Sequence, residues 1–310
     1  MSTPPSILNA LSLPESTIST LSTSLSGFTT TGRLTVQKGE EGRIYFVKIS
    51  DGRVAQEMFR GEFTSLNAIA DAVPGFCPRG VAYDSLDASS KKWFLITEFL
   101  DLTGSKGARD TKNGLASRLG RLHSTPAPRI NEQRMFGFPV PTFCGDTKQA
   151  NMARESWAQF YAEDRLLGIL AISERRNGRD TSLREMVERT AEKVVPALLR
   201  AGHLGFDSKG AGQEITPVVV HGDLWSGNAG YGRIITRGEA DEGNTDERRE
   251  SDGGAVVYDP SACYAHSEYE LGIMRMFGGF EPAFVDEYHR IVPRTEPVDE
   301  YEDRIALYEL

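Results

Sequence analysis

Hydrophobic and polar residues recur with different periods over the first hundred positions. GRLTVQKGEEGRIYFVKIS reads as two strands around a charged turn at 39–42. VAQEMFRGEFTSLNAIADAV carries apolar residues at helical spacing and predicts an amphipathic helix over 54–73. KKWFLITEFLDL has the apolar run of a buried strand. This order predicts a small mixed lobe over residues 1–98. Its first 30 residues, rich in serine and threonine, are expected to lie loosely on the surface or to form one short helix.

The rest of the chain has mainly helical periodicity and predicts a larger lobe over residues 99–310. Two short apolar runs, PVVV at 217–220 and AVVY at 255–258, interrupt the helices, and each leads to an aspartate. Between them, a charged, glycine-containing stretch without periodicity predicts a flexible insertion over about 234–253. The expected class is therefore α+β. The predicted helices lie around 112–124, 154–176, 181–202 and 267–277.

Composition narrows the class of protein. A chain of 310 residues that is 39% hydrophobic can bury a large core, and a net charge of -9 argues against a nucleic-acid or anionic-membrane partner. Three widely spaced cysteines form neither a disulfide framework nor a CxxC zinc site. No run approaches the roughly 18 apolar residues of a membrane span, and the N-terminus lacks a secretion signal. We expect a cytoplasmic protein, as a monomer or weak dimer.

The stretch HGDLWSGN, residues 221–228, changes abruptly from buried aliphatics to closely spaced polar groups. Taken alone it could be a tight turn, because glycine, aspartate and asparagine all favour turns. However, the spacing of Asp223 and Asn228 matches the catalytic loop of kinases, in which the aspartate accepts a proton from the attacking hydroxyl and the asparagine holds magnesium. Asp259 follows the second apolar run and supplies another carboxylate of the kind that suits Mg²⁺.

A lysine and a glutamate in the first lobe complete the pattern. Lys48 lies in the predicted strand YFVKIS, and Glu62 lies on the helix that follows. A strand lysine paired with a helix glutamate holds the α- and β-phosphates in protein-kinase-like folds. The alternative is an edge-strand lysine that faces solvent. The order of all five polar residues along the chain favours the kinase interpretation.

Several longer blocks resemble the fructosamine/ketosamine-3-kinase family, which is related to aminoglycoside phosphotransferases and choline kinases. The most specific are HGDLWSGN and YDPSACYAHSEYELGIMRMFGGF, and the resemblance covers most of residues 43–290. It implies a protein-kinase-like fold with two lobes. Further blocks in the family's order are FVK, MFRGEFTSL, TEFLDL, LGRLHS, FGFPVPTFCG and ESWAQFYAEDRL.

The resemblance also implies roles for individual residues, with ATP and Mg²⁺ as cofactors. Asp223 would be the catalytic base, and Asn228 with Asp259 would hold Mg²⁺. Nucleotide-binding residues would be Lys48, Glu62 and the hinge residues Glu98, Phe99 and Leu100. Acceptor-binding residues would be Trp225, which would stack on the sugar unless it only packs in the core, and His266 with Glu268, which would line or brace the same pocket.

The activity that the resemblance implies is phosphorylation of the 3-hydroxyl of ketosamines on glycated proteins or small molecules. Ribulosamines are expected to be preferred over fructosamines, and breakdown of the phosphorylated product would free the lysine amine. Two alternatives stay open: another small-molecule kinase, acting on an aminoglycoside or a choline-like alcohol, and a catalytically silent scaffold. The chain departs from the family in having no clear glycine-rich loop ahead of Lys48, since the stretch SLSGFTTTGR offers only Gly27 and Gly32. Its stop at Leu310 also predicts a truncated last helix.

Overall fold

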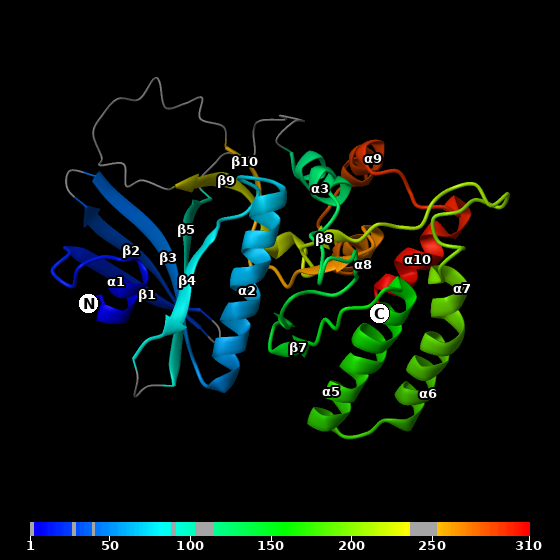
Figure 1. Cartoon of the computed structure of the whole chain (residues 1–310), viewed down its shortest axis with the longest axis horizontal. Helices are drawn as coiled ribbons and strands as arrows, with labels where there is room; N and C mark the ends of the chain where they lie inside the picture. Colours follow the sequence, from blue (N-terminus) through cyan, green and yellow to red (C-terminus); the bar gives the residue numbers. More distant parts are fainter. Residues whose placement is uncertain (1–2, 27–28, 39–40, 88–90, 103–113, 236–252) are drawn as a thin grey trace. The chain divides into compact units, whose positions relative to one another are not determined.

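The computed structural model describes residues 3–26, 29–38, 41–87, 91–102, 114–235 and 253–310 (Figure 1). The chain packs as two compact units. The first comprises Met1–Gly114 with Ala229–Tyr258, and the second comprises Leu115–Asn228 with Asp259–Leu310. The lobes expected from the sequence, 1–98 and 99–310, stay a prediction. In the structure, the described residues 229–235 and 253–258 belong to the first unit.

The first unit is built on a sheet of seven described strands, in the order β1-β2-β3-β5-β9-β10, with β4 also paired to β5. Every neighbouring pair is antiparallel. β5 pairs with β3 as far as Glu98 and with β9 from Phe99 onward. The strands are β1 (Ser19–Ser26), β2 (Thr29–Lys38), β3 (Glu41–Asp51), β4 (Gly80–Ser85), β5 (Lys92–Asp101), β9 (Ala229–Ile235) and β10 (Gly254–Val257).

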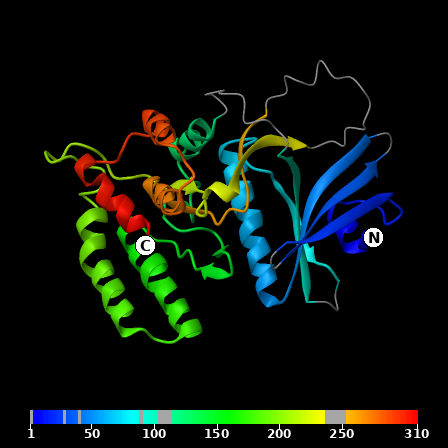
Figure 2. The same cartoon turned by 180° about the vertical axis from the view of Figure 1, so that it is seen from behind.

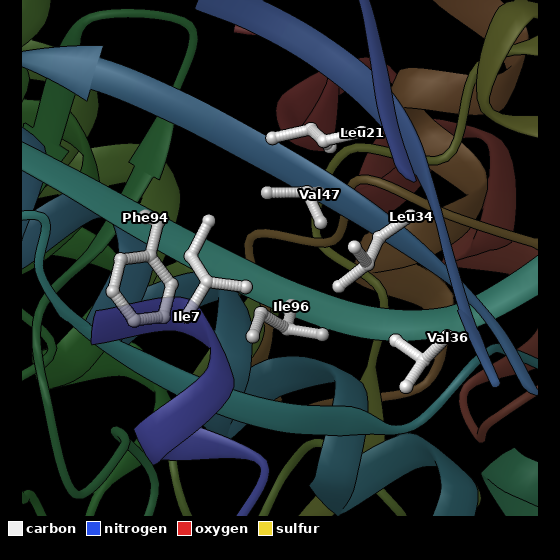
Figure 3. Close-up of a cluster of buried hydrophobic side chains, with 7 residues drawn as sticks. All are labelled: Ile7, Leu21, Leu34, Val36, Val47, Phe94 and Ile96. Carbon is white, nitrogen blue, oxygen red and sulfur yellow. The ribbon is translucent and has the colours of Figure 1, made fainter. Parts of the chain in front are cut away.

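The two faces of this sheet bury different side chains, because successive residues of a strand point to opposite faces. On one face, Ile7 of α1 (Pro5–Ala10) packs over Val47 and Phe94 (Figure 3). Lys48 and its cross-strand neighbour Leu95 lie on the other face, against α2 (Arg53–Ala72). This alternation carries Lys48 to the helix instead of the apolar cluster.

The prediction for the first 30 residues is wrong in part. A short helix does form at Pro5–Ala10, but Ser19–Ser26 is a full strand of the sheet, paired with β2. Leu21 of this strand and Ile7 are both buried in the cluster of Figure 3. The strand was missed because its serines and threonines hide the alternation, although threonine favours strands.

The second unit is mainly helical, as expected, and its described residues include two small two-stranded sheets. α5 and α6 lie side by side in both views, and α8 packs against α10 (Figure 2). β8 pairs antiparallel with β11. Its elements are α3 (Leu115–Ser124), β6 (Thr142–Cys144), β7 (Thr147–Gln149), α4 (Trp157–Phe160), α5 (Gly168–Asn177), α6 (Thr181–Arg189), α7 (Val195–Leu199), β8 (Val218–Val220), β11 (Cys263–Ala265), α8 (Glu268–Phe277), α9 (Pro282–Ile291) and α10 (Tyr301–Tyr308).

The predicted helices around 154–176 and 181–202 begin later or end earlier than expected. The first begins at Trp157, because the Ser156 side chain accepts a hydrogen bond from the backbone N–H of Gln159 and caps the helix. Each contains a π-helical stretch, Tyr161–Leu167 in the first and Thr190–Val194 in the second.

Some residues of the predicted loops fall outside the part of the chain that the structure describes. Most of the charged insertion predicted at 234–253 falls on residues 236–252, which lie outside the described residues, and so does Gly27. Gly32 lies within β2. Among the helices that the structure describes, none is long and apolar enough to cross a membrane.

Candidate active site

Lys48 and Glu62 form a close ion pair in the first unit. Nζ of Lys48 donates to Oε1 of Glu62 across 2.7 Å, and the two side chains are 13% and 16% exposed. Lys48 lies on β3, between β2 and β5, so it is not a lysine of an edge strand. The structure therefore brings together the lysine and the glutamate that the sequence singled out. A half-buried cation of this kind suits a polyphosphate.

The predicted hinge residues lie at the end of β5. Oε2 of Glu98 accepts a 2.9 Å hydrogen bond from the backbone N–H of Arg79. In the sheet register Phe99 is opposite Ile235 and Leu100 is opposite Ile234. Glu98, Phe99 and Leu100 thus form the point at which β5 changes partner. Contact of their backbone with adenine stays a prediction.

The second unit holds the catalytic-loop motif at the end of β8. Three buried valines, Val218–Val220, lead to His221, Gly222 and Asp223. Gly222 has φ +78°, and a Cβ there would lie 2.1 Å from the carbonyl oxygen of Ser261. Only glycine meets both conditions, since other residues rarely adopt this φ. The glycine of HGD therefore lets the chain turn tightly against the 259–262 segment.

Asp223 and Asn228 are in direct contact. Nδ2 of Asn228 donates to the backbone oxygen of Asp223 across 2.9 Å and to its Oδ2 across 3.3 Å. Asn228 is buried and ends the short 3-10 turn Ser226–Asn228. Because its amide nitrogen faces Asp223, its amide oxygen is left to point elsewhere, as a metal ligand requires. Burial raises the pKa of the Asp223 carboxyl, while the charge of His221 acts in the opposite direction.

Asp259 lies where the chain enters the second unit after β10. Its φ of +58° is uncommon outside glycine, although aspartate tolerates this region better than most residues. Two residues later, the backbone N–H of Ser261 donates to the carbonyl of His221 across 2.9 Å. β11 then pairs with β8. The fold thus holds the segment that carries Asp259 against the catalytic loop, and its role as a metal ligand stays a prediction.

Trp225 is exposed, which excludes the alternative of ordinary core packing. Its side chain is 40% exposed, and its backbone N–H donates to the carbonyl of Asp223 across 3.1 Å. The ring centroid lies 6.1 Å from that of Phe277. The structure therefore leaves an indole accessible two residues from the predicted base.

His266 and Glu268 lie close together in a buried network. Nε2 of His266 is 3.9 Å from Oε2 of Glu268. The imidazole makes hydrogen bonds of 2.9 Å with the Tyr308 hydroxyl and 2.8 Å with the Thr295 hydroxyl. The Arg304 guanidinium donates to both oxygens of Glu268, from Nε across 2.7 Å and from Nη2 across 3.2 Å. These contacts brace the segment between α9 and α10 against the start of α8, and an acceptor role for the pair stays a prediction.

The ionisation of this pair follows from burial and neighbouring charge. Burial lowers the pKa of His266 to about 4. Burial acts to raise the pKa of Glu268, but His266, Arg304 and the Thr295 backbone outweigh it and lower that pKa. The network is therefore held by an ionised glutamate and a neutral imidazole at neutral pH. His266 also lines a cavity of about 380 Å³ whose described lining includes Ser267 and Thr295 but not Asp223 or Trp225.

Two residues of the site were missed from the sequence. Both oxygens of the fully buried Glu270 accept backbone N–H bonds, from His221 and from Gly222. The signal was a second carboxylate, besides Glu268, in the largely apolar helix segment EYELGIMRMF. The thiol of Cys144 lies beside Asp223, and burial, with a further contribution from the Asp223 charge, raises its pKa to about 12. No spacing in the sequence links Cys144 to Asp223.

The chain is similar in sequence to known kinases over most of its length. A family model described as fructosamine kinase matches residues 13–310. A ketosamine-3-kinase of Mus musculus is 30% identical over 291 residues, covering 87% of this chain and 81% of the relative. A chloroplastic protein-ribulosamine 3-kinase of Oryza sativa subsp. indica is 27% identical over 264 residues, covering 85% of this chain and 65% of the relative.

A solved structure supports the fold. A crystal structure from Thermobifida fusca YX-ER1, described as that of a candidate fructosamine-3-kinase, superimposes with a TM-score of 0.67 at 22% identity. It covers 94% of this chain and 84% of that chain. The predicted α+β, kinase-like fold is confirmed.

Proposed function

The chain belongs to the fructosamine kinase family, and from this premise we propose that it transfers the γ-phosphoryl group of ATP to the 3-hydroxyl of a ketosamine. The family predicted from the sequence is thereby confirmed, and with it the enzyme class: the protein is a kinase, that is, a phosphotransferase. The observation that carries the proposal is the Asp223–Asn228 contact in the turn that follows β8. This contact places a carboxylate and an amide side by side, as phosphoryl transfer to an alcohol requires.

Asp223 would orient the acceptor hydroxyl and take its proton. The hydroxyl oxygen forms a bond to the γ-phosphorus while the bond from that phosphorus to the β,γ-bridging oxygen breaks, and ADP leaves with the electron pair. Proton transfer to a positioned carboxylate is effective when the carboxylate is ionised but not strongly acidic. Burial of the Asp223 carboxyl raises its pKa in this direction.

Lys48 would contact the α- and β-phosphates, with Glu62 fixing its ammonium group. The 2.7 Å pair limits the rotamers of a long side chain and so lowers the entropy lost when the nucleotide binds. Glu98, Phe99 and Leu100 would lie along the adenine.

The donor atoms of Asn228 and Asp259 fit Mg²⁺. Both supply hard oxygen ligands, and the orientation of the Asn228 amide leaves its oxygen available for a cation. When bound with ATP, Mg²⁺ neutralises the charge that develops on the phosphate oxygens. Asn228 and Asp259 would hold the ion, while Asp223 keeps its carboxylate for the hydroxyl proton.

We propose ketosamines attached to lysine as the acceptors, with ribulosamines preferred, and one relative is named a protein-ribulosamine 3-kinase. Both glycated proteins and small ketosamines carry this group. In the product, loss of phosphate from C3 and addition of water release the lysine amine and a deoxy-dicarbonyl sugar. The proposed role of the enzyme is therefore deglycation of amines.

The test is ATP consumption by the purified full chain with Mg²⁺ and a panel of acceptors. Ribulosamine-, erythrulosamine- and fructosamine-bearing lysine are compared with kanamycin and choline, and Asp223→Asn serves as the inactive control. Turnover of the ketosamines alone, fastest with ribulosamine, is the expected result. Turnover of kanamycin or choline but no ketosamine would assign a different acceptor. Absence of turnover with every acceptor would favour a silent scaffold.

A further inference from the structure

Two exposed aromatic rings form an open corner beside the catalytic loop. Trp225 is 40% exposed and Phe277 is 60% exposed. Their ring centroids are 6.1 Å apart and their planes meet at 47°. Large aromatic side chains that remain accessible next to a predicted base are candidates for ligand contact, since most such rings are buried in the core.

Close backbone packing holds this corner in place. A Cβ on Gly227 would lie 2.1 Å from the Trp225 ring, so the indole rests directly over a glycine. Phe277 ends α8, and Gly278 and Gly279 follow with φ of +66° and +89°. A Cβ on Gly279 would lie 2.7 Å from the Ser226 side chain. The turn after α8 therefore sits against the catalytic loop, and glycine is needed at each close approach.

In the part of the chain that the structure describes, the cation–π contacts involve rings other than those of Trp225 and Phe277. Within the described ranges, arginines lie over the rings of Phe99, Phe160 and Tyr301, but over neither ring of the corner. Arg275, two residues before Phe277, is paired with Glu302 at 2.8 Å and also with Glu309. The aromatic faces of the corner are thus left for a cation from outside the protein.

We propose that the Trp225–Phe277 corner binds the positively charged amine of the ketosamine through cation–π contact. This inference rests on the proposed function. A ketosamine carries a basic secondary amine on C1, which is protonated at neutral pH, and only the carbons C1, C2 and C3 separate it from the reacting hydroxyl. Trp225 donates its backbone N–H to the carbonyl of Asp223 across 3.1 Å, so the ring and the predicted base belong to the same turn. Trp is the strongest cation–π partner among the side chains.

The corner would give the enzyme a way to distinguish a glycated amine from a free ketose. A free sugar presents the same hydroxyls but no ammonium group, so it gains nothing from the ring faces. Phe277 is therefore assigned as a specificity-determining residue, whose effect depends on the charge of the acceptor and not only on its size.

The experiment compares two acceptors that differ only in charge. One is an N-alkyl ribulosamine, and the other is the neutral ether in which oxygen replaces the C1 nitrogen. kcat/KM is measured for both with wild type, Phe277→Leu, Phe277→Tyr and, as a matched control, Met276→Leu. Met276 is 51% exposed on the same helix. We expect Phe277→Leu to lose about 3- to 30-fold on the amine with little change on the ether, and Phe277→Tyr and Met276→Leu to retain the preference.

Several results would overturn the inference. Equal losses of Phe277→Leu on both acceptors would show that the ring contributes packing alone, and no loss on either would remove Phe277 from the site. A wild type that uses amine and ether equally well would also contradict it, while leaving the proposed function in place. A wild type that turns over no ketosamine would refute the proposed function itself. Thermal unfolding of each variant checks that the fold is intact.

Discussion

The carboxylate of Glu270 accepts a 3.0 Å hydrogen bond from the backbone N–H of Gly222, the residue before Asp223. Its other oxygen accepts the backbone N–H of His221. Glu270 lies on α8 and is fully buried. A buried carboxylate that receives two N–H groups is strongly oriented, so α8 sets the path of the chain into the predicted base.

Glu270→Gln should reduce both stability and turnover. Glutamine offers one acceptor oxygen, and its NH₂ group would face a backbone N–H, leaving a buried donor unpaired. We expect a loss of about 1–3 kcal/mol in the free energy of unfolding. kcat should fall with little change in the KM for ATP. Urea denaturation and steady-state kinetics measure the two effects.

Glu302→Gln is the matched control for this change. The Glu302 side chain is 70% exposed and pairs with Arg275 on the surface. Surface ion pairs contribute little, so this variant should keep both its stability and its kcat. An unchanged kcat in Glu270→Gln would show that the turn before Asp223 holds its geometry without α8.

Asp223→Asn should abolish turnover without destabilising the fold at neutral pH. Burial raises the pKa of this carboxyl above its ordinary value of 3.8, so the ionised form costs the folded state more than the unfolded state. That cost is absent below the unfolded pKa and grows as pH rises through the folded pKa. The variant should therefore match or exceed the wild type in unfolding free energy at pH 7, with the difference shrinking toward pH 3. A variant that is less stable at pH 7 would contradict this sign.

Lys48→Met should lower kcat/KM for ATP by about 10- to 100-fold, the range expected for loss of a charged hydrogen-bond donor. Glu62→Gln should lower it less, because the ammonium group remains. The double variant should lose little more than Lys48→Met, since the two residues act as a pair. Lys209→Met, at an exposed turn, is the control. Additive losses would indicate that the two side chains act separately.

The unfolding free energy should fall between pH 7 and pH 5 because of His266. Burial lowers the pKa of this imidazole to about 4. Its stabilising contribution is present above the unfolded pKa and is lost as pH falls toward the folded value, about 1–2 kcal/mol of it by pH 5. His266→Gln removes the titrating group, so its stability should depend less on pH over this window. Parallel pH profiles for wild type and variant would show that His266 does not titrate as expected.

Local patterns predicted much of the fold and of the site. Apolar residues at helical spacing predicted a helix at 54–73, and the structure has one at Arg53–Ala72. The turn that carries Asp223 and Asn228 was recognisable because its residues lie within a single short motif. Elements whose partners are remote were harder to find. Ser19–Ser26 is a strand because β2 lies beside it, and its own polar sequence shows no clear alternation.

The α+β class, the family and the polar residues of the proposed chemistry could be predicted without a structure, because each is recognisable from short motifs and local periodicity. Tertiary structure alone decided that Glu270 bonds to Gly222, that Phe277 stands beside Trp225, and that β9 and β10 join the first unit. These contacts join segments that are far apart in the sequence. They depend on how buried surfaces pack together, and the local periodicity of the sequence does not predict that packing.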